Sequence, residues 1–171
     1  MTAMLIEIGS DDQDIVAGLA VDPLSEAYAG GSIGDVFDRL RASPPLQTPF
    51  ALYDEDKVVG FIVLREADAL PDWAVQGCIT LSNLRIDKQC QGRGYGKLAI
   101  RLAARWIMAN RPQVTTIMSS VNMANDAALA LNAACGFTAT GRIVQGLIGR
   151  QTILSSPVER LRHEQSAPKS K

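Results

Sequence analysis

Three alternating glycines stand where a strand-like run ends and a helical pattern begins. Residues 84–97 read Leu-Arg-Ile-Asp-Lys-Gln-Cys-Gln-Gly-Arg-Gly-Tyr-Gly-Lys. Gly92, Gly94 and Gly96 permit a positive φ and let a ligand approach the backbone without a Cβ in the way. The amide N–H groups of such a turn attract an anion, as does the N-terminus of the helix behind it. Lys97 adds a positive charge, so we expect a phosphate-bearing ligand here.

Two common nucleotide-binding motifs fit this turn poorly. The P-loop needs a serine or threonine after its lysine, whereas Leu98 stands there, and the first glycine of that motif is also missing. The dinucleotide fingerprint is matched by Gly94, Gly96 and Ala99. That fingerprint expects an acidic residue after the following strand, where this chain has Asn122. A nucleotide-dependent oxidoreductase stays open as an alternative on this match.

A third phosphate-binding pattern, Q/R-x-x-G-x-G/A, is matched by Gln91, Gly94 and Gly96. A second landmark, N-x-x-A-x-x-L-x-x-x-x-G-F, covers residues 125–137. Together, in this order and at this separation, they resemble the GNAT superfamily of acyl-CoA-dependent N-acyltransferases. The resemblance extends over residues 50–158 and is looser in the N-terminal helices.

The resemblance implies an α/β fold with a mixed, mostly antiparallel sheet of six to seven strands, splayed into a V and flanked by about four helices. Acetyl-CoA would lie in the splay between strands 77–86 and 114–121, with its pyrophosphate on the amides of the turn. Backbone groups of Leu84 and Ile86 would bind the pantetheine and the acyl carbonyl. The residues that the resemblance assigns to acetyl-CoA are Leu84, Arg85, Ile86, Gln91, Gly92, Arg93, Gly94, Tyr95, Gly96, Lys97, Asn125 and Asn132.

The implied reaction transfers an acetyl group from acetyl-CoA to a primary amine of a small molecule, by direct attack in a ternary complex. The amine must first lose a proton, to a carboxylate or to ordered water. Many GNAT enzymes protonate the leaving thiolate with a tyrosine at the position of Asn132, and asparagine cannot act as an acid. We name no catalytic base, and Asp87 is expected to cap the turn. The other candidate carboxylates are Asp22, Glu26, Asp35, Asp38, Glu66, Asp68 and Asp72.

Residues 86–97 look most like bacterial spermine/spermidine-type acetyltransferases. That resemblance implies a polyamine acceptor, held by acidic residues of the N-terminal helices and of the segment 66–72. The similarity lies in the cofactor half of the chain, which reports on acyl-CoA rather than on the acceptor. Two alternatives therefore stay open, a non-catalytic acyl-CoA-binding module and a protein or peptide N-acetyltransferase.

The elements that must position these residues are read from periodicity and turn residues. A helical pattern over 94–110 repeats apolar residues every four positions, and an alanine-rich helix follows over 127–134. The region 11–43 reads as helices broken at Asp22-Pro23 and at Gly30-Gly31. The expected strands cover 4–8, 50–53, 58–65, 77–86, 114–121, 137–144 and 147–158.

Length and composition limit the class of protein. The 171 residues suit one domain, which we place at 1–158 with a polar C-terminal tail at 159–171. The net charge of −1 gives no basic excess, so we expect no nucleic-acid partner. No apolar run approaches the ~20 residues of a membrane span, so we expect no membrane partner and a cytoplasmic location.

The nucleophilic and metal-binding residue types are sparse. Cys78, Cys90 and Cys135 lie far apart, and the one histidine is His163 in the tail. This set is too small for a zinc site, so we expect no metal. Cys90 lies beside the glycine turn but lacks a histidine partner for thiol catalysis. The run 143–154 carries few charges, which leads us to the hypothesis of a homodimer through the last strands.

Overall fold

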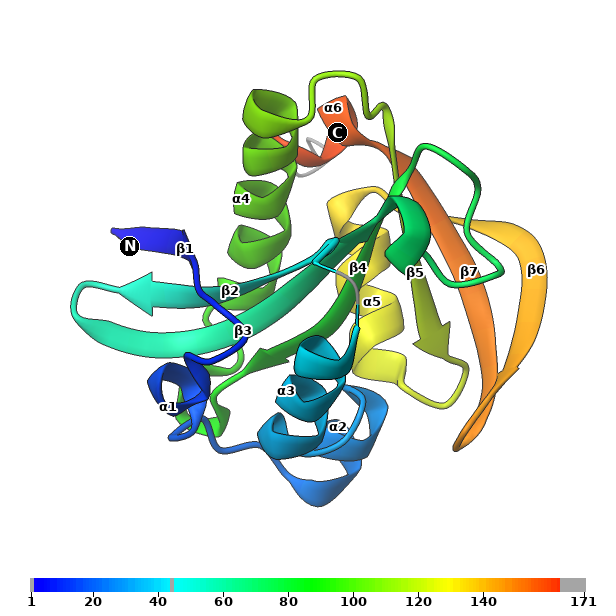
Figure 1. Ribbon diagram of the computed structural model, residues 1–171. Coiled ribbons are helices and arrows are strands. Elements are labelled where there is room, and N and C mark those ends of the chain that lie inside the picture. The colour runs from blue at the N-terminus through cyan, green and yellow to red at the C-terminus, as the bar shows by residue number, and fades with distance from the viewer. Residues whose placement is uncertain (1, 44, 164–171) are drawn as a thin grey trace, which may run out of the picture.

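A seven-stranded sheet of order β1-β2-β3-β4-β5-β7-β6 forms the centre of the computed structural model, which describes residues 2–43 and 45–163 (Figure 1). Neighbouring strands run antiparallel except β4 and β5, which are parallel. The expected mixed, mostly antiparallel α/β fold is thereby confirmed. The strands are β1 Ala3–Glu7, β2 Gln47–Asp54, β3 Lys57–Glu66, β4 Ile79–Ile86, β5 Thr116–Asn122, β6 Thr138–Gly146 and β7 Gly149–Pro157.

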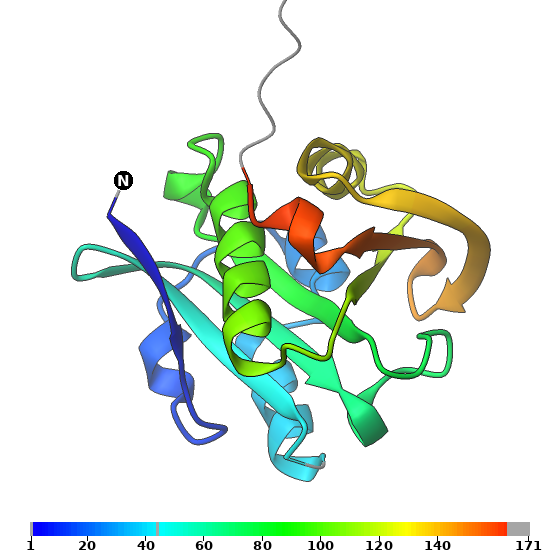
Figure 2. The same ribbon diagram turned by 90° about the horizontal axis from the view of Figure 1, so that it is seen from above.

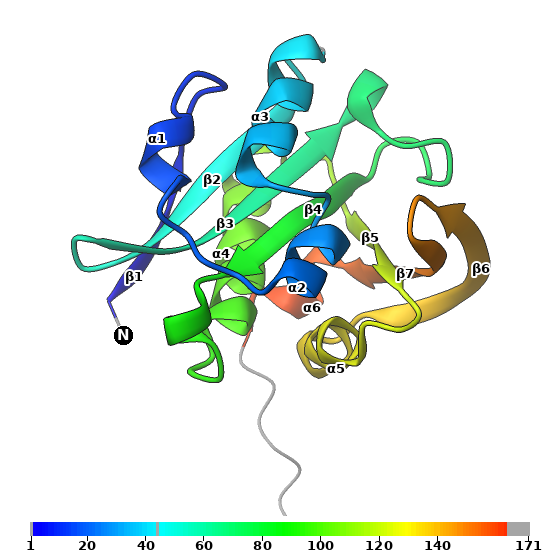
Figure 3. The ribbon, with the colours of Figure 1, turned by 90° about the horizontal axis from the view of Figure 1, so that it is seen from below.

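Helices cover both faces of the sheet. Helices α1, α2 and α3 lie on one face, and α4 and α6 lie on the other (Figures 2 and 3). Helix α5 packs against α4 and contributes to the same hydrophobic core. The helices are α1 Gln13–Val16, α2 Pro23–Tyr28, α3 Ile33–Ala42, α4 Tyr95–Asn110, α5 Asp126–Cys135 and α6 Val158–Leu161, with 3-10 turns at Ala67–Ala69 and Lys88–Cys90.

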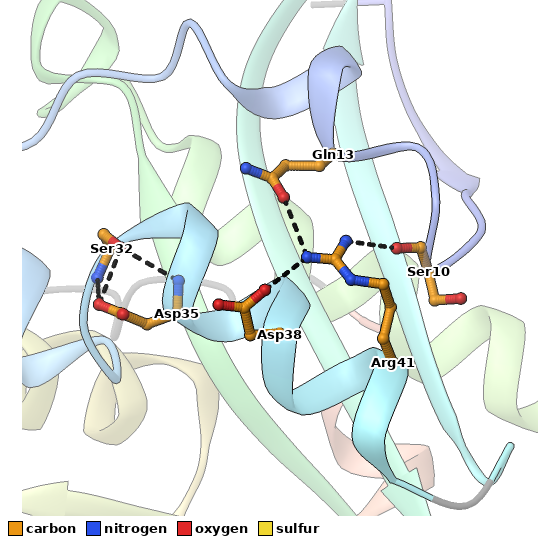
Figure 4. Close-up of polar contacts among 6 residues, drawn as sticks. All are labelled: Ser10, Gln13, Ser32, Asp35, Asp38 and Arg41. Carbon is orange, nitrogen blue, oxygen red and sulfur yellow. Dashed lines mark hydrogen bonds and ion pairs between the residues drawn. The ribbon is translucent and has the colours of Figure 1, made fainter.

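Capping residues set the ends of helices α2, α3 and α5 near the positions expected from the sequence. Asp22 accepts a hydrogen bond from the backbone N–H of Ser25 at 3.0 Å and starts α2. Ser32 and Asp35 form a reciprocal capping box at the start of α3 (Figure 4). Gly136 ends α5 in the left-handed conformation, with φ 110°. The predicted breaks around α2 are confirmed.

Two apolar layers hold the helices to the sheet. On one face, Ile100 and Ile107 of α4 pack against fully buried strand residues such as Ile117. On the other face, Phe37 of α3 lies against Phe61 of β3, with ring centroids 5.6 Å apart. Strand β3 is therefore buried on both faces, which accounts for its nearly continuous apolar sequence.

Strands β4 and β5 separate soon after they meet. Only Ile79 with Ile117 and Thr80 with Met118 are paired in register. Further along β4, the pairing with β3 contains one extra β4 residue next to Asn83, whose φ is 58°. Such a bulge bends and twists a strand. The two strands then diverge toward their carboxyl ends (Figure 1).

The packed part of the chain extends beyond residue 158, where we had placed the start of a polar tail. Val158 and Leu161 of α6 are 2% and 1% exposed, and α6 packs against α4. A single turn with two apolar residues is too short for a periodic pattern, so the sequence did not reveal it. Residues 164–171, the rest of the expected tail, lie outside the described residues.

Replacement of Leu161 by alanine should lower the free energy of unfolding by about 2–4 kcal/mol, because it leaves a cavity in a packed core. Urea unfolding followed by circular dichroism measures this loss. Leu24→Ala is the matched control, since the Leu24 side chain is 59% exposed and its truncation should change stability by less than about 0.5 kcal/mol. Equal stability of the Leu161 variant and the wild type would show that α6 is not part of the folded core.

Candidate active site

A cleft of about 660 Å³ passes through the sheet where β4 and β5 diverge. Its walls come from both faces, because α2 contributes residues on one side and α4 and α5 on the other. Arg93 does not line it, but the other residues expected to contact acetyl-CoA do. Those lining residues are Leu84, Arg85, Ile86, Gln91, Gly92, Gly94, Tyr95, Gly96, Lys97, Asn125 and Asn132.

The glycine turn forms one end of the cleft, and a structural feature disfavours a side chain at each of its glycines. Gly92 and Gly94 have φ values of 74° and 87°, a region that disfavours side chains. A Cβ on Gly96 would come within 3.0 Å of the Leu131 side chain of α5. Gly94 is also the N-cap of α4, where no side chain caps the first amides, and Lys97 adds its charge to this end. This end of the cleft can therefore bind an anion.

Gln91 and Tyr95 hold the glycine turn in place. The side-chain amide of Gln91 donates to the carbonyl of Ile86 at 3.1 Å. The hydroxyl of Tyr95 donates to Asp54 of β2, and its ring packs in a core cluster with Leu52. The hydrogen bond to Asp54 raises the pKa of Tyr95. Tyr95 thus anchors the start of α4 with its hydroxyl directed to the β2–β3 hairpin.

Arg85 directs its guanidinium to the α2–α3 turn. It donates to the carbonyls of Ala29 at 2.7 Å and Gly31 at 3.0 Å, and the residue is only 4% exposed. Burial lowers the pKa of Arg85 to about 10, so the group is still charged at neutral pH. Its side chain therefore belongs to the face of α2 and α3, opposite the face of α4.

The two asparagines of α5 line the cleft from its other side. Asn125 accepts from the backbone N–H of Ala128 at 3.2 Å and caps the helix, as the sequence predicts. Asn132 is 6% exposed and donates its side-chain amide to the carbonyl of Ala128 at 2.8 Å. The side-chain amide of Asn132 has no acidic proton, so the described cleft has no acid at this position.

The structure adds lining residues that sequence patterns did not single out. They come from the second helix, from the middle of β4 and from the end of β5, where isolated polar residues carry no motif. These residues include Ser25, Tyr28, Ser82, Asn83, Ser119, Ser120 and Asn122. Cys90 is buried beside the turn and also lines the cleft, while His163 accepts a hydrogen bond from Arg162. Only the tertiary fold brings the polar residues of α2, β4 and β5 together at the cleft.

The candidate carboxylates serve other contacts. Asp87 accepts from the backbone of Gln89 and of Ala20, both at 3.0 Å, and so caps the turn as expected. Figure 4 shows Asp38 paired with Arg41, at 2.6 Å. Among the residues that the structure describes, no aspartate or glutamate lines the cleft.

The other acidic residues are also engaged or lie outside the cleft. Hydrogen bonds from Ser25 and Ser32 lower the pKa of the capping residues Asp22 and Asp35, respectively. Glu66 forms an ion pair with Arg111 at 2.8 Å. Asp68 and Asp72 are exposed residues of the connection between β3 and β4.

Residues 2–43 and 45–163 contain neither a metal-binding cluster nor a membrane-spanning helix. No group of three or more histidine, cysteine, aspartate or glutamate side chains there is placed to hold a metal ion. None of the helices in this part of the chain has the length and apolar character needed to cross a bilayer.

Comparison with known proteins identifies the family of the chain. Residues 12–137 match the model of the acetyltransferase (GNAT) family. No curated protein sequence matches the chain significantly. Among solved structures, the aminoglycoside acetyltransferase AAC(6')-Ib in complex with paromomycin and acetyl-CoA has a TM-score of 0.76 at 17% identity, covering 97% of this chain and 99% of its own.

Two other similar structures carry the same fold. Spermidine N-acetyltransferase from Vibrio cholerae, in complex with CoA and spermine, has a TM-score of 0.70 at 15% identity, with 94% and 98% coverage of the two chains. An acetyltransferase from Thermus thermophilus has a TM-score of 0.67 at 24% identity, with 92% and 97% coverage. The family match spans most of the chain and includes the glycine turn at the end of the cleft. The chain therefore belongs to the acetyltransferase (GNAT) family, enzymes that transfer acetyl groups from acetyl-CoA to amines.

Proposed function

We propose that this protein acetylates the primary amine of a small molecule, by direct attack of the amine on acetyl-CoA in a ternary complex. One observation carries the proposal. The cleft passes through the sheet, so that its anion-binding end at the glycine turn and its opening beside α2 meet where β4 and β5 diverge. A thioester approaching from one face and an amine from the other would meet at this point.

The residues of the cleft would divide the binding of acetyl-CoA among them. The amides from Gln91 to Gly96 and the charge of Lys97 would hold the pyrophosphate. Backbone groups of Leu84 and Ile86, freed from sheet pairing by the divergence of β5, would bind the pantetheine arm and the acetyl carbonyl. Asn125 and Asn132 line the arm's side of the cleft on α5. Arg93, outside the cleft lining, would act through the charge it adds to the turn.

Proton transfer would depend on water rather than on a side-chain base. No carboxylate lines the described part of the cleft, whereas hydroxyls of Ser82, Ser119 and Ser120 do. These groups can order water, which would carry the proton of the bound ammonium to solvent before the neutral amine attacks the thioester. The leaving thiolate would be protonated in the same way, because Asn132 has no acidic proton.

A polyamine acceptor follows from the motif resemblance, and the similarity to a spermidine N-acetyltransferase supports it. The charge distribution favours another class of acceptor, since no acidic residue lines the described cleft and four of the expected ones, Asp22, Asp35, Asp38 and Glu66, cap helices or form ion pairs. A protein or peptide acceptor and a non-catalytic acyl-CoA-binding role are the alternatives. Release of free thiol with a small amine would exclude the non-catalytic role.

The assembly and the location of the protein are proposals of their own. We propose a homodimer through β6, an edge strand with the exposed residues Ile143, Leu147 and Ile148 at or near its end. Light scattering after size exclusion tests it, and a monomeric mass would contradict it. The three cysteines are buried and form no disulfide among the described residues, which is consistent with a reducing compartment, so we propose the cytoplasm. Cell fractionation tests that location.

The first experiment is calorimetric titration with CoA and acetyl-CoA, followed by detection of free thiol in the presence of amines. We expect Kd values in the micromolar range, which correspond to a binding free energy on the order of −8 kcal/mol. We also expect thiol release that depends on both substrates. Binding of NAD without binding of CoA would overturn the proposed function.

A further inference from the structure

We infer that the acceptor is a small amine that also carries a carboxylate, and that an arginine cluster on the α3 face of the sheet binds this carboxylate. The arginine cluster consists of Arg39 of α3, Arg65 of β3 and Arg85 of β4. The inference rests on the proposed function and specifies its acceptor. It follows from the sign and the pairing of the charges on the acceptor side of the cleft.

The charged residues that line the cleft are both cationic. Among the described residues they are Arg85 and Lys97. Lys97 belongs to the glycine turn, where the phosphates of acetyl-CoA would neutralise it. Arg85 lies on the opposite face, where its charge has no such partner. The acceptor side of the cleft is therefore electropositive.

No hydrogen-bond partner of Arg85 neutralises its charge, because all the partners are neutral. The partners are the backbone carbonyls of Ala29 and Gly31, and more distantly that of Asn83 at 3.5 Å. Glu26 raises the pKa of Arg85 through its charge, but no ion pair joins the two. A buried cation without a bound carboxylate is unusual, because buried charges are normally paired. The remaining N–H groups of Arg85 can donate to a ligand.

Arg39 and Arg65 extend the positive charge along the same face. Arg39 donates to the carbonyl of Gly30, and its charge, after the effect of burial, lowers the pKa of Arg65. The Nε of Arg65 is buried without a hydrogen-bond partner among the described residues. The same holds for the hydroxyl of Thr80, which stands directly opposite Arg65 in the sheet. The Nε of Arg65 and the hydroxyl of Thr80 are thus buried polar atoms on paired residues, and buried polar atoms without a protein partner indicate a place where a polar ligand or a water molecule can supply the hydrogen bond.

A carboxylate is the group that complements this arrangement. Guanidinium groups bind carboxylates through two parallel hydrogen bonds, and the charge on both partners strengthens the contact. Two carboxylates act on the cluster through their charge, Glu26 on Arg85 and Asp35 on Arg39, but among the described residues neither forms an ion pair with an arginine of the cluster. A polyamine would instead place further positive charge beside three cations.

The geometry also sets the length of the acceptor. Arg65 faces Thr80, which precedes the cleft-lining Ser82 by two residues along β4. At about 3.3 Å per residue, Arg65, which unlike Arg85 does not line the cleft, lies about 7 Å along the sheet from Ser82, near which the reaction would occur. An amine and a carboxylate separated by several methylene groups span this distance. We therefore use acceptors with a six-carbon chain as probes.

The test compares three acceptors of equal length, 6-aminohexanoate, hexylamine and 1,6-diaminohexane, together with spermidine. Free-thiol release gives kcat/KM for each. We expect 6-aminohexanoate to exceed hexylamine about tenfold or more, since a charge-assisted pair contributes about that factor, and to exceed both polyamines further. A preference for either polyamine, or equal rates for all four, would overturn the inference while leaving the proposed function intact. If acetyl-CoA binds but no amine is acetylated, both fail.

Variants assign the effect to the cluster. Arg39→Gln and Arg65→Gln should each raise the KM for 6-aminohexanoate about tenfold and leave the KM for hexylamine and the Kd for CoA unchanged. Arg41→Gln is the matched control, because Arg41 lies on the same helix but pairs with Asp38 and Ser10 (Figure 4). It should leave all of these constants unchanged. Equal losses for 6-aminohexanoate and hexylamine would show a merely structural role for the cluster and overturn the inference.

Discussion

Replacement of Gly94 by glutamate should weaken the binding of CoA about a hundredfold or more, to the limit of calorimetric detection. The new carboxylate would stand at the N-cap of α4, where the phosphates are expected to bind. Two like charges about 4 Å apart near a protein surface repel each other by about 4 kcal/mol. Titration with CoA measures the loss, and thiol release should fall with it.

The same substitution also strains the backbone, so its control must carry equal strain. Gly77 has a φ of 80°, close to the 87° of Gly94, and an added Cβ there meets no atom within 4 Å. Gly77→Glu therefore introduces the same charge and conformation outside the cleft and should retain CoA affinity. Micromolar binding by the Gly94 variant, or equal losses in both, would show that the turn is not the phosphate site. The dinucleotide alternative would then be tested with NAD.

Replacement of Asn132 by tyrosine should raise kcat about tenfold, less than the roughly 10²–10⁴-fold that a fully positioned general acid contributes, because the site did not evolve around a tyrosine. Asn132 lines the cleft on α5, and the GNAT resemblance places the usual acidic tyrosine at this position. The phenol would supply the proton that asparagine cannot give to the leaving thiolate. Steady-state thiol release with 6-aminohexanoate or hexylamine measures the change.

The control for this gain is Asn132→Phe, which has the same ring and no proton to donate. We expect kcat of the phenylalanine variant to stay at or below the wild-type value. The gain from tyrosine should disappear as the pH rises through about 10, where a phenol loses its proton. An equal kcat for both variants would mean that protonation of the thiolate does not limit turnover in this protein.

Local sequence signals predicted most of the secondary structure and the cofactor end of the cleft. The Asp22-Pro23 break, the cap at Asn125 and the left-handed Gly136 each act within one turn of the chain, so neighbouring residues decide them. The glycine turn is equally local, because its φ values and the start of α4 lie within a few residues. The short helix α6 escaped prediction because its two buried residues pack against α4, far away in the sequence.

The acceptor side depends on contacts between distant segments, and the tertiary structure alone decided it. The opening between β4 and β5 follows from pairing that stops after Thr80 and from the bulge at Asn83. The guanidinium of Arg85 reaches the α2–α3 turn, more than fifty residues earlier in the chain. Of the acidic residues expected to bind a polyamine, Asp22 and Asp35 cap helices and Asp38 and Glu66 form ion pairs, and none of the expected residues lines the cleft. The sequence by itself determined the glycine turn, where we expect the phosphates to bind, because that conformation belongs to a few neighbouring residues. The positive charge on the α3 face, where we propose that the acceptor binds, arises only when three separate elements fold together.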